Sequence, residues 1–263
     1  MIEELLIFSF LGIFAGLIAG MFGIGGGIII VPVLVTSFIS LGFEEEIIVH
    51  LAIGSSMASI FFTGIASANA HRKKNAINYN MMKPVAFGII FGALLGAFFA
   101  LQLEGDILKI IIGSFVILVA IQIGFDFEFK SRNDKPQNIQ SYIAGSGIGF
   151  LSSILGIGGG IFSVPYFKSS GLSLTSSVGT SAACGIPIAF FGALGYFFMG
   201  MNNVLMPSLS YGYIYLPAVF GISITSVFAA QYGARLAHFV STVTLKRLML
   251  SLMITIAIYM IVI

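Results

Sequence analysis

Long apolar runs, separated by short polar or turn-rich breaks, make up most of the chain. They lie at 5–22, 27–41, 47–70, 81–102, 107–125, 139–155, 160–170, 174–200, 208–234 and 248–263. Most have the roughly 17–25 residues that a helix needs to cross a bilayer, but 27–41 is marginal and 160–170 is too short. Both of these follow a run of glycines. We therefore predict glycine-broken helical hairpins at 5–41 and 139–170, which gives eight full spans, or ten segments when hairpin arms are counted.

The first half of this pattern recurs in the second half. Ten of the 21 residues in Gly12–Pro32 are found again in Gly145–Pro165, and the shared core reads Gly-Ile-Gly-Gly-Gly-Ile followed by Val-Pro. Further along, Gly54-Ser55-Ser56 corresponds to Gly179-Thr180-Ser181. Two similar halves, each with a glycine break near its start, are typical of membrane transporters that bind their substrate at the middle of the bilayer.

The repeat also predicts the domain organisation. Each half contributes five segments, an odd number, so the second half should cross the membrane in the opposite direction to the first. We expect an all-α polytopic membrane protein of two inverted-topology repeats, at 1–125 and 139–263. The polar stretch 126–138 is the expected cytoplasmic linker between them.

Composition excludes a soluble protein. Hydrophobic residues make up 58% of the chain and charged residues 8%, with a mean hydropathy of +1.06, which is more apolar surface than a soluble core could bury. The net charge of +2 and the lack of a basic stripe with interleaved aromatics argue against nucleic-acid binding. The acidic start, Met1-Ile2-Glu3-Glu4, differs from the basic start of a signal peptide, so the first apolar run is expected to be retained.

Basic residues predict the orientation, because cytoplasmic ends of spans collect Lys and Arg. On the predicted segments, eleven of the twelve fall on one side: Arg72, Lys73, Lys74, Lys83, Lys130, Arg132, Lys135, Lys168, Arg235, Lys246 and Arg247. Only Lys109 falls on the other side, together with Glu3, Glu4, Glu44, Glu45, Glu46, Glu104 and Asp106. The chain is therefore expected to be a multi-pass protein of the cytoplasmic (inner) membrane with both termini outside.

The two glycine tips are the strongest candidates for a binding site. A glycine run that ends one helix and opens the next leaves backbone N–H groups unpaired at the positive end of a helix dipole, and such an arrangement binds anions. The alternative is that the glycines only permit close packing or a kink. Inverted symmetry can bring the two tips together, and hydroxyls of the Gly-Ser-Ser and Gly-Thr-Ser blocks could either face the site or bond their own helices. The candidate substrate-binding residues are Gly23, Gly25, Gly26, Gly27, Ser55, Ser56, Gly156, Gly158, Gly159, Gly160, Thr180 and Ser181.

Other chemistry finds little support in the sequence. Cys184 is the only cysteine, and His50, His71 and His238 are scattered, so no catalytic group, metal site or cofactor is expected. The glycines do not predict a nucleotide site either, because no strand precedes them. The charged residues within the predicted segments, Lys83, Lys109 and Lys168, each stand two residues from a segment end. No Asp, Glu, Lys or Arg therefore lies deep in a predicted span, which argues against a proton relay through side chains. A ligand held by backbone amides and hydroxyls is better matched by a compact oxyanion than by a cation.

These blocks, together with Gly212–Pro217 and Gly233–His238, resemble the sulfite exporter TauE/SafE family over nearly the whole chain. The resemblance implies transport, usually outward, of small sulfur-containing anions such as sulfite or sulfoacetate. A secondary transporter of such an anion, with membrane lipid as its surroundings, is therefore the leading hypothesis. The alternatives are an anion channel and, with no clustered catalytic residues to support it, an intramembrane enzyme. Neither the particular anion nor an oligomeric state follows from the sequence.

Overall fold

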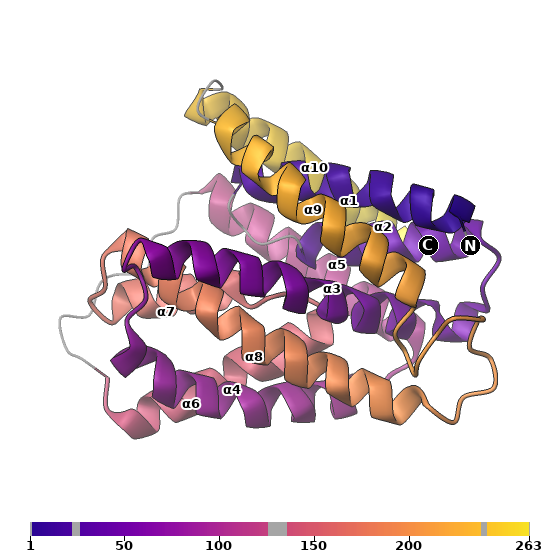
Figure 1. The fold of residues 1–263 in the computed structure, drawn as a ribbon, viewed down its shortest axis with the longest axis horizontal. Helices are drawn as coiled ribbons and strands as arrows, with labels where there is room; N and C mark the ends of the chain where they lie inside the picture. Colours follow the sequence, from indigo (N-terminus) through magenta and orange to yellow (C-terminus); the bar gives the residue numbers. More distant parts are fainter. Residues whose placement is uncertain (1, 23–26, 126–135, 238–240, 263) are drawn as a thin grey trace.

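The computed structural model describes residues 2–22, 27–125, 136–237 and 241–262. These residues form ten helices (Figure 1), one for each predicted segment. They are α1 (Ile2–Phe22), α2 (Gly27–Ser40), α3 (Glu45–Lys73), α4 (Tyr79–Ala100), α5 (Gly105–Gly124), α6 (Asn138–Leu155), α7 (Gly160–Ser169), α8 (Leu174–Gly200), α9 (Leu216–Ala237) and α10 (Thr242–Val262). Within the described ranges, the only β pairing is an isolated bridge between Ser210 and Tyr215.

The starts of α9 and α10 differ most from the prediction. The helix predicted at 208–234 begins only at Leu216, because the residues before it form an irregular connection in which Leu209 and Gly212 have positive φ angles of 69° and 56°. Pro217 is the second residue of α9, where proline is tolerated. The helix α10 begins at Thr242, six residues before the predicted 248.

Glycines set the closest helix contacts. On α4, Gly88, Gly92 and Gly96 face the carbonyl oxygens of residues 142, 146 and 150 of α6, so even a Cβ would collide with that backbone. On α1, a Cβ at Gly12 or Gly16 would lie 2.8 Å or 2.7 Å from a Cα atom of α9. These stripes therefore act as the packing surfaces that small residues at four-residue spacing predict. Gly20 continues this four-residue spacing on α1, but its surroundings lie outside what the structure describes.

Helix pairs are arranged around a central contact. The helices α3 and α8 pack against each other, α1 packs on α9, α4 on α6, and α5 on α10 (Figure 1). The short helices α2 and α7 pack on α3 and α8, respectively. Glu45 and Glu46 in the first turn of α3, and Arg72 and Lys73 in its last, complement the dipole of this longest helix.

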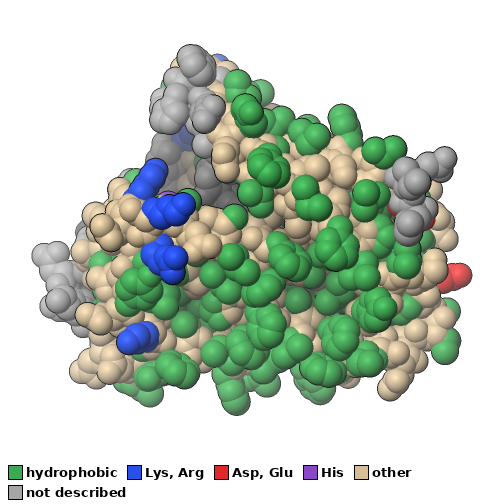
Figure 2. Space-filling model, viewed as in Figure 1, with side chains coloured by type: hydrophobic (Ala, Val, Ile, Leu, Met, Phe, Trp, Pro, Cys, Tyr) green, Lys and Arg blue, Asp and Glu red, His purple; other side chains and the backbone are tan. Residues whose placement is uncertain are grey.

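The outer surface is apolar. Hydrophobic side chains cover most of the face shown in Figure 2. Large hydrophobic side chains such as Phe87, Phe91 and Phe98 on α4 are exposed. Five helices of the described chain, α3, α4, α5, α8 and the Leu216–Gly233 part of α9, are long and apolar enough to cross a membrane. An all-helical molecule with several such helices and an apolar outer surface is a multi-pass membrane protein.

Candidate anion-binding site

The second glycine tip joins α6 to α7 through two glycines in left-handed conformation. Gly156, which ends α6, has a φ of +68°, and Gly159, which caps the start of α7, has a φ of +73°. The N–H groups of Gly156 and Ile157 both donate to the carbonyl of Ser152, which closes the end of α6. Only glycine adopts these backbone angles without a steric penalty, so the tip depends on the residue type at both positions.

Four backbone amides at this tip are available as hydrogen-bond donors within the described part of the chain. The N–H groups of Gly158, Gly159, Gly160 and Ile161 have no acceptor in the described part of the chain, and the first bonds of α7 run from Phe162 and Ser163 to the carbonyl of Gly159 at 3.0 Å and 2.9 Å. Three of the four residues, Gly158, Gly160 and Ile161, keep partial exposure. Free donors at the positive end of a helix are the arrangement that binds an anion.

The start of α2 lies against this second tip. A Cβ on Gly27 would stand 2.6 Å from the Cα of Ile157 and 2.9 Å from the carbonyl oxygen of Gly156. Two helix N-termini therefore meet, one from each half of the chain. Gly23, Gly25 and Gly26, the other candidates of the first tip, lie outside the described residues.

Two of the predicted hydroxyls lie at the second tip. Ser56 of α3 donates a hydrogen bond of 2.8 Å to the carbonyl of Gly156. Ser181 of α8 lies 2.6 Å from the hydroxyl of Ser163, which is within 2.9 Å of the carbonyl of Gly159. The central helices α3 and α8 thus both reach the tip through a buried hydroxyl.

The other two predicted hydroxyls contact helix connections instead. Ser55 accepts a hydrogen bond of 2.9 Å from the N–H of Tyr215, the residue before α9. Thr180 accepts one of the same length from the N–H of Asn78, the residue before α4. Among the described residues, neither hydroxyl bonds the tip, so a direct role in binding stays a prediction for both.

Three serines around the tip were missed by the sequence reasoning. Ser152 and Ser153 near the end of α6 and Ser163 in α7 are all 0% exposed. Ser55 and Ser56 were selected because their block recurs in the second half as Gly-Thr-Ser, whereas the signal of the Ser152-Ser153 pair is its place inside an apolar run directly before a glycine tip. It had no hydroxyl counterpart in the first half of the chain, where the matching positions are Ala19 and Gly20.

Two of the titratable side chains, His50 and Cys184, are buried. The ring Nε2 of His50 lies 3.2 Å and 3.1 Å from the carbonyl oxygens of Ala100 and Leu103, which only accept, so this nitrogen carries the proton and ties α3 to the end of α4. Cys184 is a buried free thiol. No three His, Cys, Asp or Glu side chains of the described residues come close enough together to hold a metal ion.

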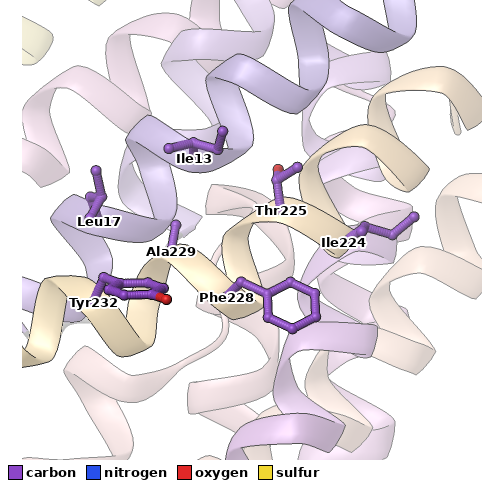
Figure 3. Close-up of a pocket in the computed structure, with 7 residues that line it drawn as sticks. All are labelled: Ile13, Leu17, Ile224, Thr225, Phe228, Ala229 and Tyr232. Carbon is purple, nitrogen blue, oxygen red and sulfur yellow. The ribbon is translucent and has the colours of Figure 1, made fainter.

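A groove of about 410 Å³ lies away from the tip, between α1 and α9 (Figure 3). It is almost entirely apolar, and its lining residues are Ile13, Leu17, Ile224, Thr225, Phe228, Ala229 and Tyr232. The hydroxyl of Thr225 donates to the carbonyl of Gly221 within its own helix. Because its lining is almost entirely apolar, the groove suits a lipid chain better than an anion.

Comparison with known proteins agrees with the resemblance seen in the sequence. Residues 8–260 match the profile of the family described as "Sulfite exporter TauE/SafE". A probable membrane transporter protein of Haemophilus influenzae is 35% identical over 261 residues, which cover 99% of both chains. Another, of Methanocaldococcus jannaschii, is 26% identical over 242 residues, which cover 91% of this chain and 88% of the relative. No solved structure matches the chain.

Proposed function

The chain belongs to the sulfite exporter TauE/SafE family, and from this premise we propose that it is a secondary transporter that exports a small organosulfur anion such as sulfite or sulfoacetate. The family and the names of its relatives support membrane transport. The anion and the outward direction are our proposal.

One observation supports the choice of an anion: the amides of residues 158–161, at the start of α7, have no acceptor among the described residues. Each helix N-terminus is equivalent to roughly half a positive charge, and amides and hydroxyls donate hydrogen bonds without carrying a proton away. The lysines and arginines with described side chains lie at helix ends or within six residues of them, at 72–74, 83, 109, 168, 246 and 247. A compact oxyanion, with several oxygens to accept these hydrogen bonds, is the best match for such donors.

We infer two inverted repeats, at 1–125 and 139–263, with 126–138 between them. The packing supports this: exchanging α1–α5 for α6–α10 converts the α1/α9 contact into α6/α4 and the α2/α3 contact into α7/α8. The contacts α3/α8 and α5/α10 convert into themselves. The bonds from Tyr215 N–H to Ser55 and from Asn78 N–H to Thr180 also exchange.

The proposed orientation places both termini outside the cytoplasmic membrane. Figure 2 shows basic side chains gathered toward one end of the molecule and an acidic side chain at the other, which is the end where both termini lie in Figure 1. Because the cytoplasmic side of a membrane protein is enriched in Lys and Arg, the basic end is assigned to the cytoplasm.

The driving force proposed for export is the membrane potential. Moving one negative charge outward through an inside-negative potential of 100 mV is favourable by about 2.3 kcal/mol, on the order of a fifty-fold gradient at equilibrium. An anion carrier without a proton relay therefore needs no other energy source.

Flux in proteoliposomes tests the proposal. Purified protein is reconstituted with labelled sulfite or sulfoacetate at equal concentration on both sides, and valinomycin with a potassium gradient sets the potential at constant pH. Net flux should saturate with substrate concentration and reverse with the sign of the potential. Non-saturating flux would favour the anion channel, and chemical conversion of the substrate by purified protein would favour the intramembrane enzyme. Flux that follows an imposed pH gradient and ignores the potential would contradict the proposed driving force.

A further inference from the structure

Two neighbouring hydroxyls of α6 are buried without a hydrogen bond. Ser152 and Ser153 are both 0% exposed, and the Oγ atoms of both lack a partner among the described residues. Leaving a buried hydroxyl unpaired costs about 1–3 kcal/mol, so native proteins rarely keep one without a reason. The usual escape in a helix, a bond to the carbonyl four residues earlier, is made by Ser59 of α3 and by Ser163 of α7 but by neither of these two.

Only Ser152 is directed at the glycine tip. Its Oγ lies 3.1 Å from the position that a Cβ on Gly159 would take, at the residue whose own N–H and whose two following N–H groups are free. Its carbonyl closes the end of α6 by accepting from Gly156 and Ile157. The backbone of Ser152 is therefore fixed by the tip, while its hydroxyl keeps a proton to donate.

Ser153 points to a different region. Its Oγ lies 2.9 Å from the position of a Cβ on Gly192 of α8, beside the sulfur of Met57, and its carbonyl accepts from the hydroxyl of Tyr196 at 3.2 Å. The two serines thus share burial, helix and lack of a partner, and they differ in which of them faces the free amides.

We propose that the Ser152 hydroxyl and the backbone amides of residues 158–161 together bind an oxyanion group of the sulfonate type, with three oxygens and a single negative charge. This rests on the proposed function, because it places the transported anion at the tip. Three oxygens offer enough acceptors for one hydroxyl and several amides, which converge from α6 and α7.

The single charge follows from the donors. The starts of α2 and α7 meet at the tip, and two helix N-termini together are equivalent to roughly one positive charge. The basic residue on α7 itself, Lys168, stands at the opposite end of that helix, about 12 Å along its axis from Gly160. Within the described part of the chain, the two helix N-termini therefore compensate one negative charge on the bound group and leave a second one uncompensated.

This charge preference distinguishes two forms of one substrate. Sulfite exists near neutral pH as singly charged bisulfite and doubly charged sulfite, and the tip should select bisulfite. Methanesulfonate, which keeps one charge throughout this range, serves as the reference. The apparent affinity for total sulfite should fall as pH rises from 6 to 8, while that for methanesulfonate should stay constant.

The test compares S152A with S153A by ligand-induced stabilisation and by proteoliposome flux. Because S152A removes an unpaired hydroxyl, its melting temperature without ligand should stay the same or rise. Its affinity for methanesulfonate and bisulfite should drop by about 10- to 100-fold, the effect of losing one hydrogen bond to a charged group. S153A should keep the affinity of the parent protein.

Other results would contradict the role of Ser152, the selection of a single charge, or the proposed function. If S152A and S153A lose affinity for the anions equally, or if unliganded S152A has a lower melting temperature, Ser152 has a structural role and does not bind the anion. An affinity for sulfite that is constant or rises from pH 6 to 8 would overturn the single-charge selection, although transport of an organosulfur anion would stand. Absence of any binding or flux by the parent protein for every sulfur anion would instead refute the proposed function itself.

Discussion

Single residues at the second tip are constrained by backbone geometry and by buried hydrogen bonds. Gly159 has a φ of +73° and no room for a side chain, since a Cβ would meet the side chain of Ile188. Ser56 gives the carbonyl of Gly156 its hydrogen bond from a different helix. The shape of the tip therefore depends on a few positions, where adding a Cβ or removing a hydroxyl should disturb the backbone.

Substituting Gly159 tests the geometric constraint. Gly159→Ala should destabilise the protein by about 1–2 kcal/mol from the left-handed backbone alone, with a further loss from the collision, and should abolish transport. Gly171 at the other end of α7 is the matched control, because its φ is +90° but a Cβ there would meet nothing within 4 Å. Gly171→Ala should lower the melting temperature through a similar backbone strain, but it should retain flux. Retained flux in Gly159→Ala would contradict a role for this tip.

Substituting Ser56 tests the hydrogen bond between α3 and the tip. Ser56→Ala leaves a buried carbonyl unpaired and should lower the free energy of unfolding by about 1–3 kcal/mol, measured by thermal or chemical denaturation in detergent. Ser59→Ala is the control, because Ser59 is equally buried but donates to the carbonyl of Ser55 in its own helix. If Ser59→Ala lowers the free energy of unfolding as much as Ser56→Ala does, the hydrogen bond to the tip contributes no more stability than a bond within a helix.

At the scale of elements, the helices associate in close pairs whose contact surfaces are glycines. In α4 and α6 the contacts are reciprocal: Gly92 faces the backbone at Ser146, while Gly149 of α6 faces that of Ile89. Because lipid is as apolar as the helix surfaces, van der Waals contact at short distance stabilises such pairs more than burial does.

A Cβ on the contact face of this pair should be harmful. Gly92→Ala places a methyl group against the Ser146 backbone and should cost about 1–3 kcal/mol as the helices are forced apart. Gly147→Ala lies on the same helix pair, on the exposed face of α6 with nothing within 4 Å, and should be neutral or stabilising by up to about 1 kcal/mol. Melting temperatures of the two variants in detergent provide the comparison. Similar values for both would argue against glycine-mediated packing.

At the scale of the whole molecule, the pairing of helices far apart in sequence sets where the connections lie. The helices α1 and α9, and likewise α4 and α6, come from different halves of the chain, whereas α2 packs on α3 and α7 on α8 within one half. This is what two interlocked inverted repeats require, and it predicts which connections share a side of the membrane.

Cysteine labelling tests that arrangement. In a Cys184→Ala background, Asn202→Cys after α8 should react with an impermeant thiol reagent added to intact cells, whereas Asn80→Cys at the start of α4 should react only after permeabilisation. Both asparagines are exposed, so access to the reagent is not limited by burial. Labelling of Asn80→Cys in intact cells would reverse the proposed orientation.

Much of the element level was determined by the sequence alone. Apolar runs long enough for a span predict helices because lipid leaves backbone groups no other partner, and each of the ten predicted segments is a helix. The start of α9 was the clearest error, since residues 208–215 are apolar enough to continue the run but contain Gly212 in a turn and pair Ser210 with Tyr215. Glycine repeats likewise pointed to the tip and to the packing stripes.

Which helices meet, and which hydroxyls reach the tip, was decided only by the tertiary structure. Spans in lipid are apolar on all sides, so their sequence carries little information about which face turns inward. Ser55 and Ser56 are neighbours with the same side chain, yet one accepts from Tyr215 and the other donates to Gly156. Ser152 and Ser153 also contact different regions, because the side chains of successive residues on a helix point about 100° apart. The positions of the neighbouring helices then determine what each side chain contacts.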